Sequence, residues 1–249
     1  MNAVAMHAPA TTKNASLSIR KVNQLYGGTQ ILWDLDLEIP PGSCTCIMGR
    51  NGVGKTTLLK CLMGLLPLKS GEILLNGEPL HTRAAHERAV LGIGYVPQGR
   101  DIFPLLTVEE NLRLGLPIGM KRRGEKVPQI PERIYELFPV LKSMLHRRGG
   151  DLSGGQQQQL AIARALVLEP SVLILDEPNE GIQPNIVSQI GDVIMQLNAE
   201  GLTVILVEQK LGFARRVGKE FRLMEKGRVV ASGAMPELTD ALIKEYLSV

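Results

Sequence analysis

The sequence GRNGVGKTT occupies residues 49–57 and fits the pattern G-x-x-x-x-G-K-[ST]. A short apolar run, 43–48, precedes it, and apolar residues recur at helical spacing in the segment 56–66 that follows. A strand, a glycine loop and a helix in this order predict backbone N–H groups that surround a phosphate chain at the positive end of a helix. We expect Lys55 to reach the outer phosphates and the Thr56 hydroxyl to hold Mg²⁺. The nucleotide contacts expected from this loop are Gly49, Arg50, Asn51, Gly52, Val53, Gly54, Lys55, Thr56 and Thr57.

The composition is that of an ordinary folded protein, with 249 residues, 44% hydrophobic and 21% charged residues and a net charge of +3. This charge is too small to indicate nucleic-acid binding, and no apolar run reaches the roughly 18 residues that span a membrane. Residues 1–15 lack the features of a secretory signal, so we expect a disordered tail. Cys44, Cys46 and Cys61 lie in apolar segments and are expected to be buried, reduced thiols of a cytosolic protein.

Two alternating segments before the glycine loop predict a small antiparallel sheet. The first is 17–26, and the second is 31–39, in which one face is expected to carry Ile31, Trp33, Leu35, Leu37 and Ile39. Tyr26 ends the first strand at a Gly-Gly turn. Its ring is expected either to stack on an adenine base or to be an ordinary surface or packing side chain, and the sequence favours neither.

The segment 71–78 predicts a strand with an Asn-Gly turn, and 93–98 predicts a buried strand with Gln98 at its exit, where ligand contacts collect. Between about 105 and 150 the pattern changes to a helical insertion. It contains a helix over 107–116 that opens with a capping box, a charged exposed loop over 119–128, and a helix over 131–141. The basic cluster Lys121–Arg123 is interpreted as solvated rather than as a site for anionic lipid or a partner.

The segment DLSGGQ, residues 151–156, precedes a helix over 157–168. Ser153 is a natural N-cap, and Gly154 and Gly155 leave backbone N–H groups bare at the helix start. This is a second anion-binding feature in one chain. We expect it to close on a nucleotide held by another subunit.

The apolar strand 171–178 ends in two adjacent carboxylates, Asp176 and Glu177. We expect Asp176 to organise Mg²⁺, directly or through water, and Glu177 to polarise an attacking water. The alternative, that they are two surface acids at a turn, is disfavoured because the residues before them, VLIL, are wholly apolar and therefore buried. The remaining chain alternates helices and strands: a helix over 185–201, a strand over 202–209, a helix over 211–219, a hairpin over 221–233 and a helix over 236–249. This alternation predicts a doubly wound α/β core.

Taken together, GRNGVGKTT, Gln98, LSGGQ and VLILDEP, in this order and spacing, resemble the nucleotide-binding subunit of an ABC transporter from about residue 16 to the end. The resemblance implies an α/β fold with a P-loop NTPase (RecA-like) core, an antiparallel β subdomain and an α-helical subdomain. The core and β subdomain would comprise 16–104 and 151–249, and the helical subdomain 105–150. It also implies a dimer that encloses ATP between each phosphate loop and the partner's signature residues, Ser153, Gly154, Gly155 and Gln156.

By position, the resemblance assigns Tyr26 to the adenine, Thr56 and Gln98 to Mg²⁺, and Glu177 to the general base. Two positions depart from the common pattern. Gln183 replaces an Asp, and Gln209 replaces the His at the switch position of a strand end. Glutamine donates a hydrogen bond to a phosphate but cannot take up a proton as His does.

These departures fit one subfamily. The segments 98–112, 176–185 and 206–210 resemble the second ATPase of branched-chain amino acid and amide importers, and most of all the ATP-binding subunit of urea importers. The implied function is ATP binding and hydrolysis, with Mg²⁺, to drive import of urea or short amides at the cytoplasmic face of the inner membrane. The implied partners are a second, different ATPase, two integral membrane permease subunits and, indirectly, a periplasmic or extracellular solute-binding protein, with no nucleic acid. A branched-chain amino acid importer and a soluble ABC ATPase that gates a non-transport assembly are the alternatives.

Overall fold

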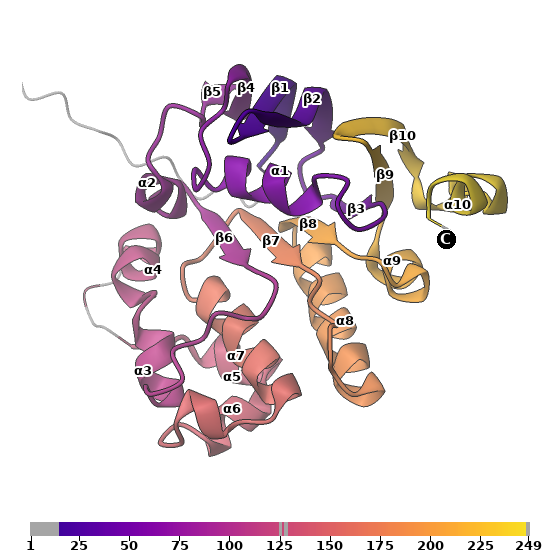
Figure 1. Ribbon diagram of the computed structural model, residues 1–249. Coiled ribbons are helices and arrows are strands. Elements are labelled where there is room, and N and C mark those ends of the chain that lie inside the picture. The colour runs from indigo at the N-terminus through magenta and orange to yellow at the C-terminus, as the bar shows by residue number, and fades with distance from the viewer. Residues whose placement is uncertain (1–14, 125, 127–128, 248–249) are drawn as a thin grey trace, which may run out of the picture.

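The computed structural model describes residues 15–124, 126 and 129–247, and its strands form two sheets with a lobe of helices below them (Figure 1). Apart from Ala15, the tail expected over residues 1–15 lies outside the described residues. No helix in the described part of the chain is both long and apolar enough to cross a bilayer.

The central sheet has six strands in the order β10-β9-β3-β8-β7-β6. Its strands are β3 (Cys44–Met48), β6 (Ile93–Val96), β7 (Val172–Asp176), β8 (Thr203–Val207), β9 (Glu220–Glu225) and β10 (Arg228–Ala234). All adjacent pairs are parallel except β9 with β10. Strands β3, β7 and β8 are buried at every residue, as expected for parallel strands covered on both faces. Their carboxyl ends therefore meet at one edge, where the chain presents its polar residues.

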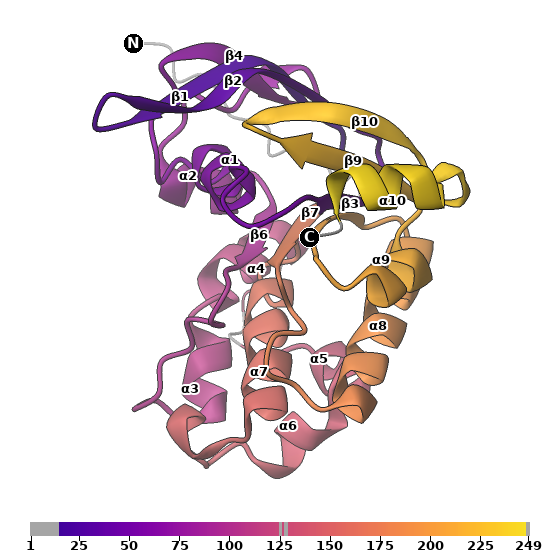
Figure 2. The same cartoon turned by 45° about the vertical axis from the view of Figure 1, so that its right-hand side comes forward.

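Helices cover both faces of the central sheet. Helix α1 (Lys55–Leu62) lies between this sheet and the second sheet, whereas α7 (Gly154–Leu166), α8 (Pro184–Ala199) and α9 (Leu211–Val217) cover the other face (Figure 2). Alternate residues of β7 follow this division, because Ile174 packs in the core on the α1 side and Leu173 and Leu175 pack in the core with α7 and α8. After β10 come a short 3-10 turn, Met235–Glu237, and α10 (Asp240–Tyr246), which lies beside β9.

The second sheet is antiparallel, with the order β2-β1-β4-β5. Its strands are β1 (Leu17–Tyr26), β2 (Thr29–Ile39), β4 (Ser70–Leu75) and β5 (Glu78–Pro79). Asn76 and Gly77 connect β4 to β5 with φ of 53° and 83°. Positive φ at both central residues is what a type I′ hairpin turn requires, so the expected Asn-Gly turn is confirmed.

The expected face of β2 is wrong at its start. Trp33 is 42% exposed and Leu32 is buried in its place. Asp34 adopts a φ of 41°, and the pairing of β1 with β2 shifts register on this stretch. A bulge of this kind moves the preceding side chains to the opposite face of the sheet. Trp33 instead lies beneath the guanidinium of Arg228, 6.0 Å from the ring centre.

The helical lobe contains α3 (Val108–Arg113), α4 (Leu116–Arg123), α5 (Glu132–Leu137) and α6 (Pro139–Ser143), and a further helix, α2 (Ala85–Val90), lies beside β6. The capping box of α3 is confirmed, since Thr107 and Glu110 bond each other's backbone N–H. The loop expected over 119–128 is wrong, because its first residues are the second half of α4. The helix expected over 131–141 is divided into α5 and α6 at Phe138, where Pro139 interrupts it.

Candidate nucleotide site

The glycine loop connects β3 to α1 through backbone conformations that favour glycine. Gly52 and Gly54 have φ of 81° and 106°, and Gly54 is the N-cap of α1. A Cβ on Gly49, where φ is 155°, would lie 2.5 Å from the carbonyl oxygen of Met224. The loop is thus held closely against β9, with the N-terminal end of α1 facing its interior.

Lys55 lies inside this loop and is only 6% exposed. Its Nζ donates to the carbonyl oxygens of Gly49 at 2.7 Å and Arg50 at 2.8 Å. Burial lowers the pKa of Lys55, whereas the nearby carboxylates of Glu177 and Asp176 raise it. The ammonium therefore lies where a phosphate chain enclosed by the loop would meet it.

A cavity of about 960 Å³ opens at the carboxyl edge of the central sheet. It brings together the expected site residues Tyr26, Asn51, Gly52, Gly54, Lys55, Thr56, Thr57, Gln98, Glu177 and Gln209. Gly49 and Arg50 join it through their carbonyl contacts with Lys55, while Val53 is partly buried and packs against the core. Tyr26 is 44% exposed at the rim, so its place agrees with a platform for a base, and this role stays a prediction.

Asp176 ends β7 with its carboxylate enclosed. The residue is 1% exposed, and neither carboxylate oxygen has a hydrogen-bond partner among the described residues. Burial, and to a smaller extent the Glu177 carboxylate, raise the pKa of Asp176 to about 6, whereas the Lys55 ammonium lowers it. These unpartnered, buried carboxylate oxygens fit Mg²⁺, which takes oxygen ligands, and the Thr56 hydroxyl lies near enough to lower the Asp176 pKa.

We expect Asp176→Asn to stabilise the nucleotide-free chain at pH 8. Because the folded-state pKa is raised to about 6, the wild-type carboxyl is favourable while protonated, and stability is lost as pH rises from about 4 through 6. The amide removes this loss, a gain of at most about 3 kcal/mol at roughly 1.4 kcal/mol per pKa unit. Urea unfolding of both proteins at pH 5 and pH 8 measures it. Equal pH dependence in the two proteins would contradict a buried charge at this position.

Glu177 occupies a strained turn with a φ of 48°, and its backbone N–H donates to Val207 at 2.9 Å. Its carboxylate accepts from Nε2 of Gln209 and, at 3.4 Å, from Nε2 of Gln98. Gln209 Nε2 also contacts Oδ1 of Asn51 at 2.8 Å. The side chain of Gln209 therefore connects the expected general base to the phosphate loop.

Sequence reasoning assigned no role to four residues of this site. Glu180, Glu208 and Lys210 line the cavity, and Asn179 contacts Glu208 below it. Glu180 accepts a hydrogen bond from Gln98 at 3.0 Å. For Glu208 a signal existed, since it follows a strand that is apolar except for Thr203, much as Asp176 ends an apolar strand.

The signature residues lie elsewhere. Ser153 caps α7, and its backbone and side chain exchange hydrogen bonds with Gln156 in a capping box. Gly154 lies against the guanidinium of Arg100, and Gly155 lies against Ile186. None of these four residues lines the cavity formed by the described part of the chain. The structure thus does not bring the two expected anion sites together within one chain.

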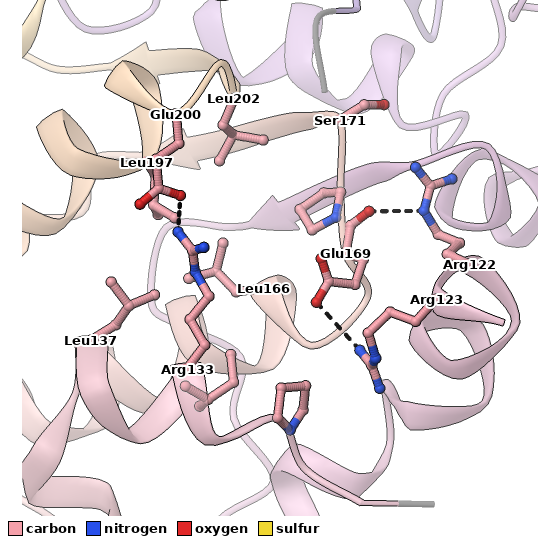
Figure 3. Close-up of a pocket in the computed structure, with 13 residues that line it drawn as sticks. Arg122, Arg123, Arg133, Leu137, Leu166, Glu169, Ser171, Leu197, Glu200 and Leu202 are labelled. Carbon is pink, nitrogen blue, oxygen red and sulfur yellow. Dashed lines mark hydrogen bonds and ion pairs between the residues drawn. The ribbon is translucent and has the colours of Figure 1, made fainter. Parts of the chain in front are cut away.

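A second cavity, of about 160 Å³, separates the helical lobe from the ends of α7 and α8 (Figure 3). Arg133 pairs with Glu200 across it, Arg123 pairs with Glu169 at 3.3 Å, and Arg122 Nε donates to the Glu169 carbonyl at 2.8 Å. Of the basic cluster expected to be solvated, Lys121 is exposed, whereas Arg122 and Arg123 hold α4 against the loop that follows α7.

This chain is similar to known proteins over most of its length. A family model described as ABC transporter matches residues 32–180. The high-affinity branched-chain amino acid transport ATP-binding protein BraG of Pseudomonas aeruginosa is 41% identical over 214 residues, which cover 86% of this chain and 91% of that protein. The probable branched-chain amino acid transport ATP-binding protein LivF of Archaeoglobus fulgidus is 39% identical over 221 residues, 88% of this chain and 92% of that protein.

Solved structures confirm the expected fold class. A dimeric ATP-binding cassette in a post-hydrolysis state, bound to ADP and Pi, has a TM-score of 0.78 at 26% identity, and the match covers 88% of this chain and 98% of that one. A nucleotide-free ATP-binding cassette from an ABC transporter has a TM-score of 0.74, also at 26% identity, over 94% of this chain and 96% of that one. These structures share the mixed α/β phosphate-loop fold.

Proposed function

Since this chain belongs to the ABC transporter family as an ATP-binding subunit, we propose that it powers an importer of the branched-chain amino acid and amide group. Its ATPase activity is the part common to the family. The observation that carries the proposal is the cavity in which Lys55, Gln98, Glu177 and Gln209 converge at the carboxyl edge of the sheet. We also propose that residues 105–150 form the helical subdomain and that the rest of 16–249 forms the core with its β subdomain.

The site residues divide the reaction among them. The loop 49–57 binds the phosphates, Lys55 neutralises their outer charge, and Tyr26 supports the adenine. Thr56, Gln98 and Asp176 would hold Mg²⁺, which when bound neutralises charge on the phosphoryl oxygens. Glu177 accepts a proton from the attacking water, and Gln209 orients Glu177 against the loop.

The place of the signature residues outside the cavity supports a dimer. Because Ser153 to Gln156 do not line this chain's own cavity, they are proposed to contact ATP held by a partner subunit. Gln183 and Gln209, which replace the common Asp and His, favour a partner that is a different ATPase with a site of unequal activity.

Membrane association is proposed for the surface that leads from Gln98 into the helical lobe. Phe103 and Leu105 on this stretch are 49% and 80% exposed. Two permease subunits of the cytoplasmic membrane are the proposed partners of this surface, with a solute-binding protein acting indirectly outside the cell. Apolar side chains at this exposure suit a protein contact better than water.

Two solutes remain, and different observations favour them. The curated relatives are named for branched-chain amino acid transport, which favours that solute. The likeness of 98–112, 176–185 and 206–210 to the urea importer subunit favours urea or short amides. In this proposal the membrane and binding-protein subunits choose the solute, and no solute pocket is assigned to this chain.

Uptake measurements test the proposal. Cells that lack this gene, complemented with wild type or with Lys55→Ala, are given labelled leucine, urea and acetamide. Wild type restores uptake of one solute and Lys55→Ala does not, because the variant lacks the phosphate-binding ammonium. Loss of leucine uptake alone assigns branched-chain amino acids, and loss of urea uptake alone assigns urea. Unchanged uptake of all three overturns the importer proposal, and co-purification with a membrane protein then tests the soluble alternative.

A further inference from the structure

Glu208 is an acidic residue enclosed at the end of β8, only 2% exposed. Its Oε1 accepts from the backbone N–H groups of Gln209 and Lys210, both at 2.8 Å, and its Oε2 accepts from Nδ2 of Asn179 at 2.7 Å. Burial raises the pKa of Glu208, and these donors and Lys210 oppose the change. A carboxylate is costly to enclose unless its oxygens are hydrogen-bonded, so this arrangement is a built feature of the site.

Asn179 forms the other half of the contact. It is 1% exposed, and its backbone carbonyl accepts from Nζ of Lys210 at 2.9 Å. Asn179 belongs to the turn after β7 that carries Glu177, whereas Glu208 and Lys210 belong to the turn after β8 that carries Gln209. Polar contacts therefore join the two turns at the wall of the cavity, and Asn179 and Glu208, whose side chains meet there, are both buried.

The contacts between the two turns fix the position of Gln209. Its backbone N–H is held by Glu208, and its side chain contacts both Glu177 and Asn51. We propose that Glu208 is a positioning residue for ATP hydrolysis, which with Asn179 fixes the turn after β8 so that Gln209 keeps Glu177 aligned with the phosphate loop. This inference rests on the proposed roles of Glu177 and Gln209.

A reciprocal exchange of the two side chains tests it. In Glu208→Gln, an amide NH₂ faces either Asn179 Nδ2 or the two backbone N–H groups, so a donor meets a donor unless the Asn179 amide turns over. Turning over would place the Asn179 NH₂ where its buried Oδ1 now has no partner among the described residues, so a buried donor stays unsatisfied in each arrangement. We expect kcat to fall about 10-fold or more, since small misplacements near reacting groups have effects of this order, while the Kd for ATP stays within about 2-fold.

Asn179→Asp alone places two carboxylates together and has a similar or larger effect. The double variant Glu208→Gln with Asn179→Asp restores one donor, one acceptor and the original charge, and we expect kcat to return to within about 3-fold of wild type.

The measurements use the full-length chain: steady-state kcat and KM, equilibrium ATP binding, Tm, and hydrogen exchange of the peptide 206–212. We expect Glu208→Gln to accelerate exchange of the Gln209 and Lys210 amides, and the double variant to restore their protection. This readout reports on the turn even when turnover is slow.

Asn198→Ala is the matched control. Asn198 is also buried, and its Nδ2 donates to the carbonyl oxygens of Gly42 and Leu202 at 3.0 and 2.9 Å, away from the cavity. We expect it to lower Tm with kcat unchanged. If Glu208→Gln behaves like this control, or if the exchange gives no rescue, Glu208 is only structural and the inference is overturned. If Glu177→Gln itself keeps normal turnover, the assigned base fails instead, and the two failures are thereby distinguished.

Discussion

Replacement of Glu177 by Gln lowers ATP turnover at this site by about 10²-fold or more while ATP still binds. The amide has the shape of the carboxylate and keeps a partner in Gln98 or Gln209, so the turn around it is retained. It cannot accept the proton of an attacking water. Steady-state hydrolysis by the full-length chain, with equilibrium ATP binding measured in parallel, gives the two quantities separately.

The matched control for this prediction is Glu200→Gln. It makes the same acid-to-amide change in the second cavity, where Glu200 pairs with Arg133 far from the reacting groups, and it should leave turnover unchanged. In a complex with a second ATPase, the partner's own base must also be removed, because its site would mask the loss. Normal turnover under that condition would show that Glu177 is not the base.

Local sequence patterns predicted most of the elements that position this site. Strands β3, β7 and β8 are short, mostly apolar segments, and the capping box of α3 and the N-cap Ser153 of α7 each depend on a few consecutive residues. Such signals act over a few residues, so they are visible without knowledge of the fold. The three cysteines are free and buried, as expected from the apolar segments in which they lie.

The errors occurred where distant packing overrides a local signal. Gly119 was interpreted as part of a turn, but a Cβ there would lie 2.0 Å from the carbonyl oxygen of Val167, so the glycine permits close approach of α4 to α7. Arg122 and Arg123 were interpreted as solvated, but Glu169, which faces them across the second cavity, is distant in sequence. The bulge at Asp34, which exposes Trp33, contains no glycine, so no residue type in this stretch of sequence indicates it.

The candidate site shows the same limit. The glycine loop and the acids at the end of β7 can be recognised from the sequence because each is a short motif. The contacts of Gln209 with Asn51 and of Glu208 with Asn179 join residues 158 and 29 positions apart. Pairing of this kind depends on which strands are neighbours in the sheet, and β3, β8 and β7 are adjacent there though well separated along the chain. Glu208 could be recognised as a polar end of a buried strand, but its partner could not.

Lys55→Ala is expected to abolish the stabilisation of the chain by ATP. In wild type, a ligand at 100-fold above its Kd raises the free energy of unfolding by about 2.7 kcal/mol, and the corresponding rise in Tm should be nearly absent from the variant. The physical reason is that Nζ of Lys55 is the buried cation enclosed by the loop, and it would exchange its carbonyl contacts for the phosphates. Thermal unfolding with and without Mg²⁺ and ATP measures the difference.

The nucleotide-free stability of Lys55→Ala should stay close to that of wild type, because truncation at the cavity wall admits water and also removes a charge whose burial lowers its pKa. Lys142→Ala is the control, since this lysine is exposed, pairs with Glu132 on α5 and should retain the full response to ATP. A variant at Lys55 that keeps the full ATP-dependent rise in Tm would show that the loop holds the nucleotide through its backbone N–H groups alone. The phosphate-neutralising role would then have to pass to another cation at the cavity, for which Lys210 is the lining candidate.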